Sequence, residues 1–518
     1  MSEQEILKPK IKLSRTKNAV RNIYSGMFNK IFTIFFPFLI RTVLIKKIGI
    51  EYAGLNSLFS SILQVLNLTE LGFASAVVYS MYKPIAEDDK DTICALLNFY
   101  KRVYFIIGLV ILALGSAVMP FLPHLIKGNV PQDINIYVLY SIYLVNTSLS
   151  YLLFGYKNSL LNAHQRRDVI SNILTITQGL MNICQLFILV TIKNYYLYVL
   201  MMPIFTVLNN VMVGIETKRM FPEYSCKGKL DISVKKDIRK KVAGLMISKL
   251  AQTSRNSFDS IFISAFLCLA MTAIYSNYML VFTSLTGIIN IITNSMQAGV
   301  GNFIQTESKE KNYELLKKLA LLYALMIGWC TACMLCIYQP FITTWLGESY
   351  KLPFAIVIMI CSYFYLLVSG QGCSLFYHGC GMWWNGKYLA ATEALVNIIG
   401  NYIFVKKFGL YGIVVATLVS TLIGNVWTLS ILFKLFFTKK RMIKFYLFEL
   451  FLAFISFLLC SLTFFINKIL DTQDSFVFAL LVTGFSATVL FFAAYILISK
   501  PLRLQVPLKI FRHKKQNK

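Results

Sequence analysis

The feature that most constrains the fold of this chain is a succession of fourteen long apolar segments joined by short polar connections. Of its 518 residues, 57% are hydrophobic and 14% are charged, whereas soluble domains average about 25% charged residues. A helix of about 20 apolar residues crosses the hydrocarbon core of a bilayer. The sequence therefore predicts an all-α polytopic membrane protein with about 14 transmembrane helices, and it excludes a soluble multidomain enzyme. The apolar segments are 18–45, 52–82, 93–119, 134–156, 169–192, 195–216, 242–267, 270–304, 319–345, 354–380, 388–405, 410–433, 445–467 and 475–499.

The many basic residues lie in the connections between the apolar segments and do not form a nucleic-acid-binding face. The formal net charge is +28, yet the basic residues lie between apolar runs. With the N-terminus in the cytoplasm, inner segments hold 36 Lys and Arg residues and outer loops hold 8. Basic residues are retained on the cytoplasmic side of membrane proteins. We therefore expect both termini in the cytoplasm, an even number of spans, and no nucleic-acid partner.

Matches at a fixed offset indicate an internal repeat. Short identities recur 215 residues apart, at Ser159/Ser374, Leu160/Leu375, Asn182/Asn397, Asn210/Asn425 and Val211/Val426. Six spans in each half would give both halves the same orientation, which predicts a parallel repeat with a cleft between two six-helix bundles. The predicted organisation begins with an N-tail at 1–17, a first bundle at 18–216 and a basic linker at 217–241. It continues with a second bundle at 242–437, two additional helices at 438–500 and a basic tail at 501–518.

Basic residues inside the first predicted span are candidates for substrate binding. Charges within hydrocarbon are costly and commonly functional. Lys30 and Arg41 are eleven residues apart, close to three helical turns, so both would lie on one face. A cationic wall of this kind, with Arg21 near the inner edge, suits an anionic substrate. The alternative is that these long side chains extend to the interfaces.

The seventh predicted span and two further acids form the second set of candidates. Lys249 and Arg255 are assigned to the substrate cavity. Asp259 is four residues after Arg255, so the two can pair on one helical face, either in function or only to neutralise each other. Glu70 and Glu393 are acids within apolar segments, and each is either the carrier of a coupling proton or a static partner for a cation.

Other polar patterns in the chain are weaker evidence for a functional site. In-span amides, Asn182 and Asn210 among them, suit sugar hydroxyls but more often form interhelical hydrogen bonds. The stretch 381–388 resembles a phosphate-binding loop but has Tyr388 where a Ser or Thr must bind magnesium. The four histidines are scattered and the cysteines lie in apolar segments, so we expect no metal site.

Several stretches resemble Wzx-type polysaccharide flippases of the MOP (multidrug/oligosaccharidyl-lipid/polysaccharide) exporter superfamily. They are PFLIR at 37–41, EYAGLNSLF at 51–59, ELGF at 70–73, DSIFIS at 259–264 and AIYS at 273–276. By this resemblance, Arg41 ends the first-span pattern and Asp259 is the acid of the seventh span. The count of fourteen spans is similar to that of the lipid II flippase branch rather than the commoner twelve.

The resemblance implies a transporter, not an enzyme, in the bacterial cytoplasmic membrane. Such a protein has a V-shaped pair of bundles and exports undecaprenyl-pyrophosphate-linked oligosaccharide repeat units by alternating access. It uses no cofactor, but coupling to H+, Na+ or the membrane potential is possible. Its partners would be the lipid-linked substrate, membrane lipids, and the polymerase and glycosyltransferases of the same pathway. The alternative is a MATE-like multidrug or cation antiporter, which would need a cleft dominated by carboxylates.

Overall fold

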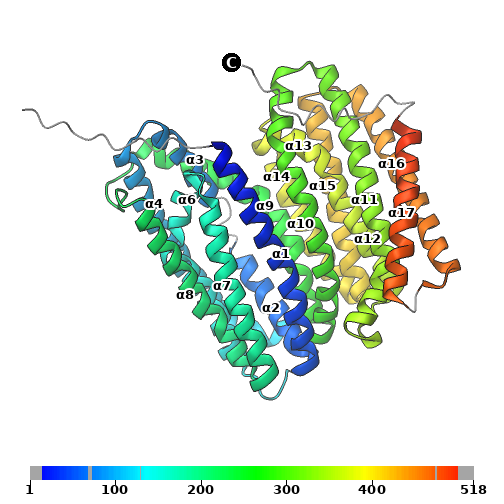
Figure 1. Cartoon of the computed structure of the whole chain (residues 1–518), viewed down its shortest axis with the longest axis horizontal. Coiled ribbons are helices and arrows are strands. Elements are labelled where there is room, and N and C mark those ends of the chain that lie inside the picture. Colours follow the sequence, from blue (N-terminus) through cyan, green and yellow to red (C-terminus); the bar gives the residue numbers. More distant parts are fainter. Residues whose placement is uncertain (1–14, 68–72, 129, 473–474, 500–518) are drawn as a thin grey trace, which may run out of the picture. The chain divides into compact units, whose positions relative to one another are not determined.

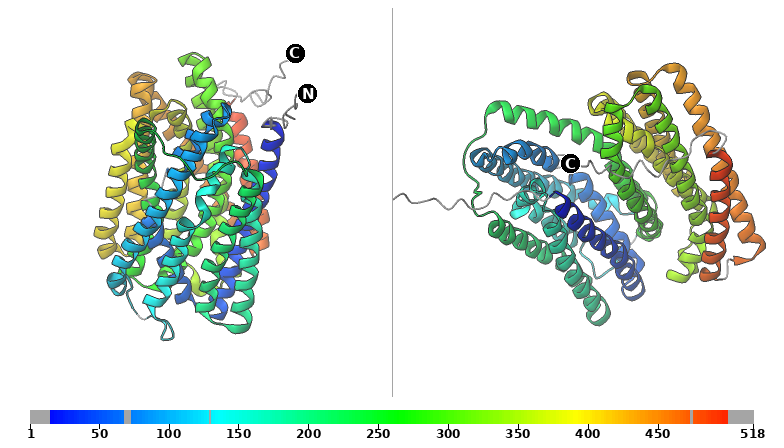
Figure 2. Two further views of the ribbon diagram at one scale, coloured as in Figure 1. Left: turned by 90° about the vertical axis from the view of Figure 1, so that its left-hand side faces the viewer. Right: turned by 45° about the horizontal axis from the view of Figure 1, so that its top comes forward.

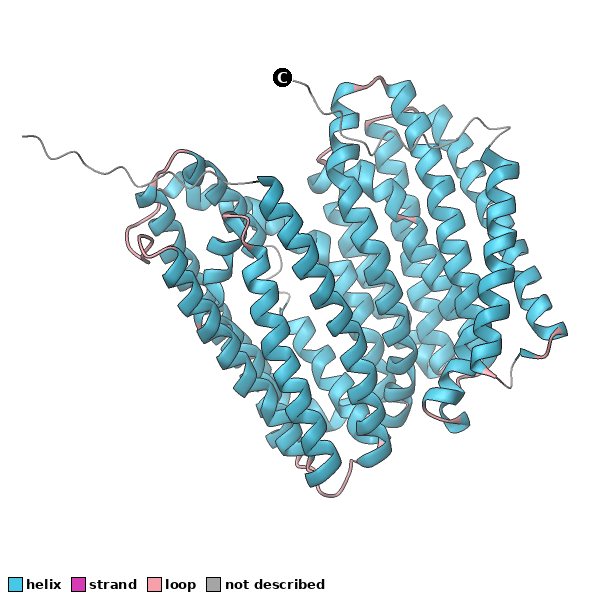
Figure 3. Cartoon of the chain, in the orientation of Figure 1, coloured by secondary structure: helices cyan, strands magenta, loops and turns pink. Residues whose placement is uncertain are grey.

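The computed structural model describes residues 15–67, 73–128, 130–472 and 475–499, and every regular element in these ranges is a helix (Figures 1 and 3). Eleven helices of the described residues are long and apolar enough to cross a membrane, and a bent pair of helices makes a twelfth. The other two predicted segments, 52–82 and 242–267, coincide with the shorter helices α2 and α3 and with the charged helix α9. The protein is therefore an all-α, multi-pass membrane protein.

Contacts divide the chain into two compact units. The first unit comprises Met1–Tyr52, Leu66–Leu122 and Val130–Met246; the second comprises Ala53–Val65, Pro123–Asn129 and Ile247–Lys518. Most of α2 thus belongs with the second unit, although it lies early in the sequence. The predicted linker 217–241 is helical from Ile232, where α9 begins.

The first unit is built from helices that are neighbours in sequence or are paired by polar contacts. Helices α1 and α7 lie side by side, as do α4 and α5, α5 and α8, and α7 and α8 (Figures 1 and 2). Helix α5 begins after Asn135, whose side chain accepts hydrogen bonds from the backbone N–H groups of Tyr137 and Val138. The helices are α1 (Arg15–Lys47), α3 (Phe73–Ala86), α4 (Lys90–Val118), α5 (Ile136–Leu152), α6 (Asn158–Ala163), α7 (Arg167–Phe187) and α8 (Tyr195–Met220).

The second unit is larger and contains the two additional helices at the C-terminal end. Helices α16 and α17 both pack against α11 (Figure 1). The indole N–H of Trp329 on α11 donates to Thr488 on α17 at 3.1 Å. The helices are α2 (Ile50–Leu66), α9 (Ile232–Phe266, from Ile247 on), α10 (Leu269–Thr306), α11 (Lys309–Trp345), α12 (Phe354–Ser369), α13 (Gln371–Gly379), α14 (Lys387–Phe408), α15 (Leu410–Leu435), α16 (Lys439–Ile469) and α17 (Phe476–Ser499).

Candidate functional site

A buried carboxylate cluster in the second unit is centred on Asp259 of α9. This carboxylate is 2% exposed. It accepts hydrogen bonds from the Asn401 amide at 2.8 Å, the Thr417 hydroxyl at 3.0 Å and the Tyr275 hydroxyl at 3.1 Å. The donors come from α14, α15 and α10, so four helices converge on one charge. A charge so far from water is tolerated only with such partners.

Further oxygens surround the same carboxylate. The Asn397 amide donates to Thr417 at 3.1 Å, and the Ser254 hydroxyl donates to the Asn397 side-chain oxygen at 3.2 Å. The side-chain oxygen of Asn401 is buried and accepts no hydrogen bond among the described residues. Carboxylate, amide and hydroxyl oxygens are the ligands that hard cations prefer. The cluster therefore has the chemistry to hold a proton or a small hard cation.

An ion pair lies beside this cluster. Arg255, which the sequence spacing allows to pair with Asp259 along α9, forms an ion pair with Glu393 on α14, and its charge also acts on Asp259. The two side chains are 12% and 10% exposed. Glu393, Asn397 and Asn401 follow each other at intervals of four residues, so they form one stripe on α14. The arginine therefore forms its ion pair with the first residue of that stripe.

Two further predicted residues cannot be placed in this site. Glu70 lies outside the described residues. Lys249 belongs to a stretch of α9 whose side chains are not described. Their roles therefore remain predictions.

Arg41 of the first unit lies in a cluster of tyrosines. Tyr143 of α5 and Tyr195 and Tyr198 of α8 are close enough to interact electrostatically with its guanidinium group. The hydroxyls of Tyr143 and Tyr195 are 3.3 Å apart, and Tyr195 also donates to the backbone carbonyl of Tyr52 at 2.9 Å. Three tyrosines thus lie near a cation in the C-terminal part of α1, and their hydroxyl groups can also hydrogen-bond to an anion.

The other two basic residues of α1 lie in different environments. Arg21 forms an ion pair of 2.8 Å with the buried Asp168 at the start of α7, while its own side chain is 38% exposed. Lys30 is half-buried, about two and a half turns further along the helix. The structure therefore uses Arg21 to hold α1 against α7, a partner that the sequence reasoning missed.

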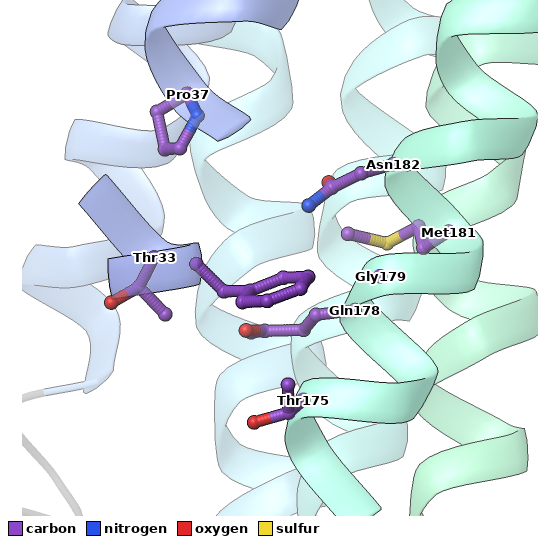
Figure 4. A pocket seen from close by; sticks show the side chains of 8 residues that line it. Thr33, Pro37, Thr175, Gln178, Gly179, Met181 and Asn182 are labelled. Carbon is purple, nitrogen blue, oxygen red and sulfur yellow. The ribbon is translucent and has the colours of Figure 1, made fainter. Parts of the chain in front are cut away.

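Polar contacts continue from this ion pair along the α1–α7 interface. The backbone N–H of Asp168 donates to the Asn22 side chain at 2.7 Å. The Asn29 amide donates to the Thr175 hydroxyl at 2.8 Å. The interface then opens into a cavity of about 240 Å³ (Figure 4). The cavity is lined by Phe32, Thr33, Pro37, Thr175, Gln178, Gly179, Met181 and Asn182.

The sequence offered a signal for Asn401, which the sequence reasoning did not identify. Asn401 follows the in-span amide Asn397 by four residues in an apolar helix, the same spacing that drew attention to Arg255 and Asp259. Thr417 and Tyr275 carry no such signal, because single hydroxyls are common in apolar helices.

No known protein family profile matches the sequence, and no curated protein matches it. Solved structures nevertheless share the fold. The lipid II flippase MurJ in an inward closed conformation has a TM-score of 0.63 at 16% identity, covering 93% of this chain and 100% of that chain.

MATE transporters share the fold as well. An inward-facing multidrug resistance MATE family transporter of the MOP superfamily has a TM-score of 0.59 at 16% identity, with 80% and 98% coverage. A variant of the Vibrio cholerae MATE transporter VcmN has a TM-score of 0.56 at 14% identity, with 81% and 96% coverage. The chain thus has the fold of MOP superfamily transporters.

Proposed function

We propose that this protein flips undecaprenyl-pyrophosphate-linked oligosaccharide repeat units across the cytoplasmic membrane by alternating access. The observation that carries the proposal is that two of the buried acids are neutralised by arginine side chains. Glu393 is ion-paired with Arg255, and Asp168 is ion-paired with Arg21 and Arg166. A carboxylate that is already ion-paired attracts a cationic drug only weakly.

The substrate's chemistry agrees with the basic residues of the first unit. The lipid tail can stay in the bilayer, but the diphosphate and sugars need a polar path. Arginine meets phosphate oxygens with charge-assisted hydrogen bonds, which are stronger than neutral ones. A membrane potential of 100 mV, negative inside, favours outward movement of each negative charge by about 2.3 kcal/mol. The potential can therefore help to drive export.

The flippase assay tests the role of Arg41 directly. In liposomes containing the purified chain and a fluorescent lipid-linked oligosaccharide, Arg41→Ala is expected to slow flipping about tenfold or more, because a charge-assisted contact to the diphosphate is lost. Arg41→Lys should retain part of the rate. The matched control is Arg219→Ala, since the Arg219 side chain is 80% exposed at the end of α8. An unchanged rate for Arg41→Ala would contradict this role.

We further propose that the Asp259 cluster binds the coupling cation. Asp259→Asn keeps the size of the side chain but removes the charge, so flipping should lose its dependence on an imposed gradient. Flipping is measured with a Na+ gradient alone and with a pH gradient alone, which identifies the ion. A variant that responds to both gradients as the wild type does would exclude coupling at Asp259.

The multidrug antiporter alternative has a specific observation in its favour, namely the MATE structures that share the fold. Resistance profiling of a deletion strain separates the two. Hypersensitivity to cationic drugs with normal surface polysaccharide would favour the antiporter. Normal drug tolerance with loss of surface polysaccharide would favour the flippase.

A further inference from the structure

The first unit contains a break in one of its spans. Helix α5 ends at Leu152, a short 3-10 turn follows at Phe154–Lys157, and α6 begins at Asn158. The chain bends by 44° at this point. The amide of Asn210 on α8 donates to the carbonyl of Leu149 at 3.3 Å, in the last turn before the break. Irregular backbone at membrane depth is tolerated where it is buried in protein or lines a polar cavity.

A cavity of about 380 Å³ lies at this break, within the first unit. Its size falls in the range of about 300–1,000 Å³ that is typical of small-molecule sites. Four segments of the unit form its walls: the start of α3, the middle of α4, the break itself, and α8. The lining residues are Ala74, Val78, Tyr100, Tyr104, Ser150, Tyr151, Gly155, Asn158, Ser159, Asn162, Asn209 and Asn210.

Among the residues that the structure describes, the lining is polar and rich in aromatic rings, and it includes no Asp, Glu, Lys, Arg or His. Four asparagines supply amide donors and acceptors. The side-chain oxygen of Asn158 is buried and accepts no hydrogen bond among the described residues. A buried acceptor left unsatisfied is costly, so a ligand that donates a hydrogen bond to it gains affinity.

Tyrosine rings form one wall of the cavity. The ring centroids of Tyr100 and Tyr104 are 4.3 Å apart, and those of Tyr104 and Tyr151 are 5.4 Å apart. Tyrosine offers an apolar face together with a polar hydroxyl. Amides for hydroxyl groups and ring faces for C–H groups are the combination that suits a sugar. A diphosphate or an organic cation would instead need a charged partner in the lining.

We propose that this cavity binds an uncharged glycosyl group of one or two rings. The proposal rests on the proposed function and deepens it, since it assigns the sugar part of the substrate to the first unit. Asn210 both lines the cavity and caps the last turn of α5. A sugar that hydrogen-bonds to Asn210 therefore acts directly on the helix break.

The test measures sugar binding without transport. The full chain is reconstituted in lipid nanodiscs, and binding of N,N′-diacetylchitobiose and of maltose is followed by saturation-transfer NMR, with inorganic pyrophosphate as the anionic probe. At least one of the sugars is expected to bind. Asn158→Leu and Asn162→Leu should each weaken that binding about tenfold, as expected for the loss of a buried hydrogen bond. Pyrophosphate binding should not change.

Asn182→Leu is the matched control, because Asn182 is an asparagine that lines the other cavity of the same unit. Val78→Trp is a second variant that fills the cavity from α3 and keeps every polar group. Thermal unfolding of each variant shows whether it folds. Sugar binding that persists in folded Val78→Trp and Asn158→Leu protein would overturn the proposal, and so would binding of neither sugar.

Flipping of the lipid-linked substrate by the same proteins separates the two proposals. If sugar binding depends on the cavity residues but the wild type flips no lipid-linked oligosaccharide, the cavity is supported and the proposed function is wrong. If the wild type flips its substrate and neither flipping nor sugar binding changes in the cavity variants, the proposed function stands and the cavity assignment is wrong.

Discussion

The two units treat the polar groups inside their helices in different ways. In the second unit two of the buried acids have protein partners: Glu393 pairs with Arg255, and Asp259 accepts hydrogen bonds from three helices. In the first unit, cavities of about 240 and 380 Å³ are lined by amides and hydroxyls. The comparison indicates that buried charges of the second unit are held by residues of the protein, whereas amides and hydroxyls of the first unit line cavities that a ligand could enter.

The helix breaks show the same contrast on a smaller scale. Asn425 of the second unit donates to the carbonyl of Leu366 on α12 at 2.6 Å, as Asn210 donates to Leu149 on α5 in the first unit. These asparagines are one of the pairs at the offset of 215 residues. In the second unit, however, Gly370 lies directly against the Asn425 side chain, and a Cβ at Gly370 would overlap the asparagine oxygen. The glycine thus lets the asparagine pack tightly, whereas the break of the first unit lies beside a cavity.

The largest expected effect comes from breaking the ion pair of the second unit. Glu393→Ala leaves Arg255 as an uncompensated buried charge, which should lower the free energy of unfolding by about 3–5 kcal/mol. The double variant Arg255→Met with Glu393→Met removes both charges and should recover most of that loss. Thermal unfolding in detergent measures both.

The matched variant in the first unit is Arg21→Gln, because Arg21 also pairs with a buried acid but is itself 38% exposed. Asp168 keeps Arg166 as a partner at 3.1 Å. The expected loss is therefore about 1 kcal/mol or less. If Glu393→Ala and Arg21→Gln lowered the free energy of unfolding equally, the proposed difference between the two units would be wrong.

A smaller effect is expected from the two capping asparagines. Asn425→Leu leaves the Leu366 carbonyl without its donor in a tightly packed region, which should cost about 1–3 kcal/mol. Asn210→Leu should cost less, because water in the adjacent cavity can replace the lost donor. The two melting temperatures are compared in the same detergent. A loss for Asn210→Leu that matches or exceeds that for Asn425→Leu would argue against a hydrated cavity.

The smallest effect is expected in the connections, where the two units should not differ. In the first unit, hydrogen bonds from the Thr92 side chain and from the Thr92 backbone N–H, which donates at 3.0 Å, lower the pKa of the Asp89 carboxyl below its ordinary value of 3.8. In the second unit, Lys351 donates to Glu348 at 2.8 Å and lowers the pKa of Glu348 below 4.5.

Folding lowers the pKa of both carboxyl groups, so each ionised carboxylate stabilises the folded protein. This stabilisation is fully present above the ordinary pKa values of 3.8 for Asp89 and 4.5 for Glu348, and it is lost as the pH falls through the lowered pKa values of the folded protein. Asp89→Asn and Glu348→Gln should therefore each cause a small drop in melting temperature at pH 7 that disappears near pH 3. The melting temperatures are measured at both pH values. A large drop for one variant alone would show that the contrast between the units extends beyond their membrane-embedded parts.

Much of the architecture could be predicted because each element depends on its own residues. Among the described residues, eleven of the fourteen predicted segments are helices that are apolar and long enough to span a membrane, and a twelfth is a bent pair of helices. Hydrocarbon forces the backbone to satisfy its hydrogen bonds within each helix. Local spacing gave Asp259 as a possible partner of Arg255. It could not give Glu393, an acid 138 residues away on another helix, with which Arg255 forms an ion pair.

The sequence by itself determined that this is an all-α membrane protein, with intramembrane charges and a pair of asparagines at a fixed offset, because hydropathy and spacing are properties of the chain alone. Only the tertiary structure decided which groups meet: Glu393 with Arg255, Asp168 with Arg21, and Asn401, Thr417 and Tyr275 around Asp259. It also decided which asparagine packs against a glycine and which one lines a cavity. The physical reason is that the cost of a polar group in a membrane depends on its partners, and those partners come from helices far apart in the chain.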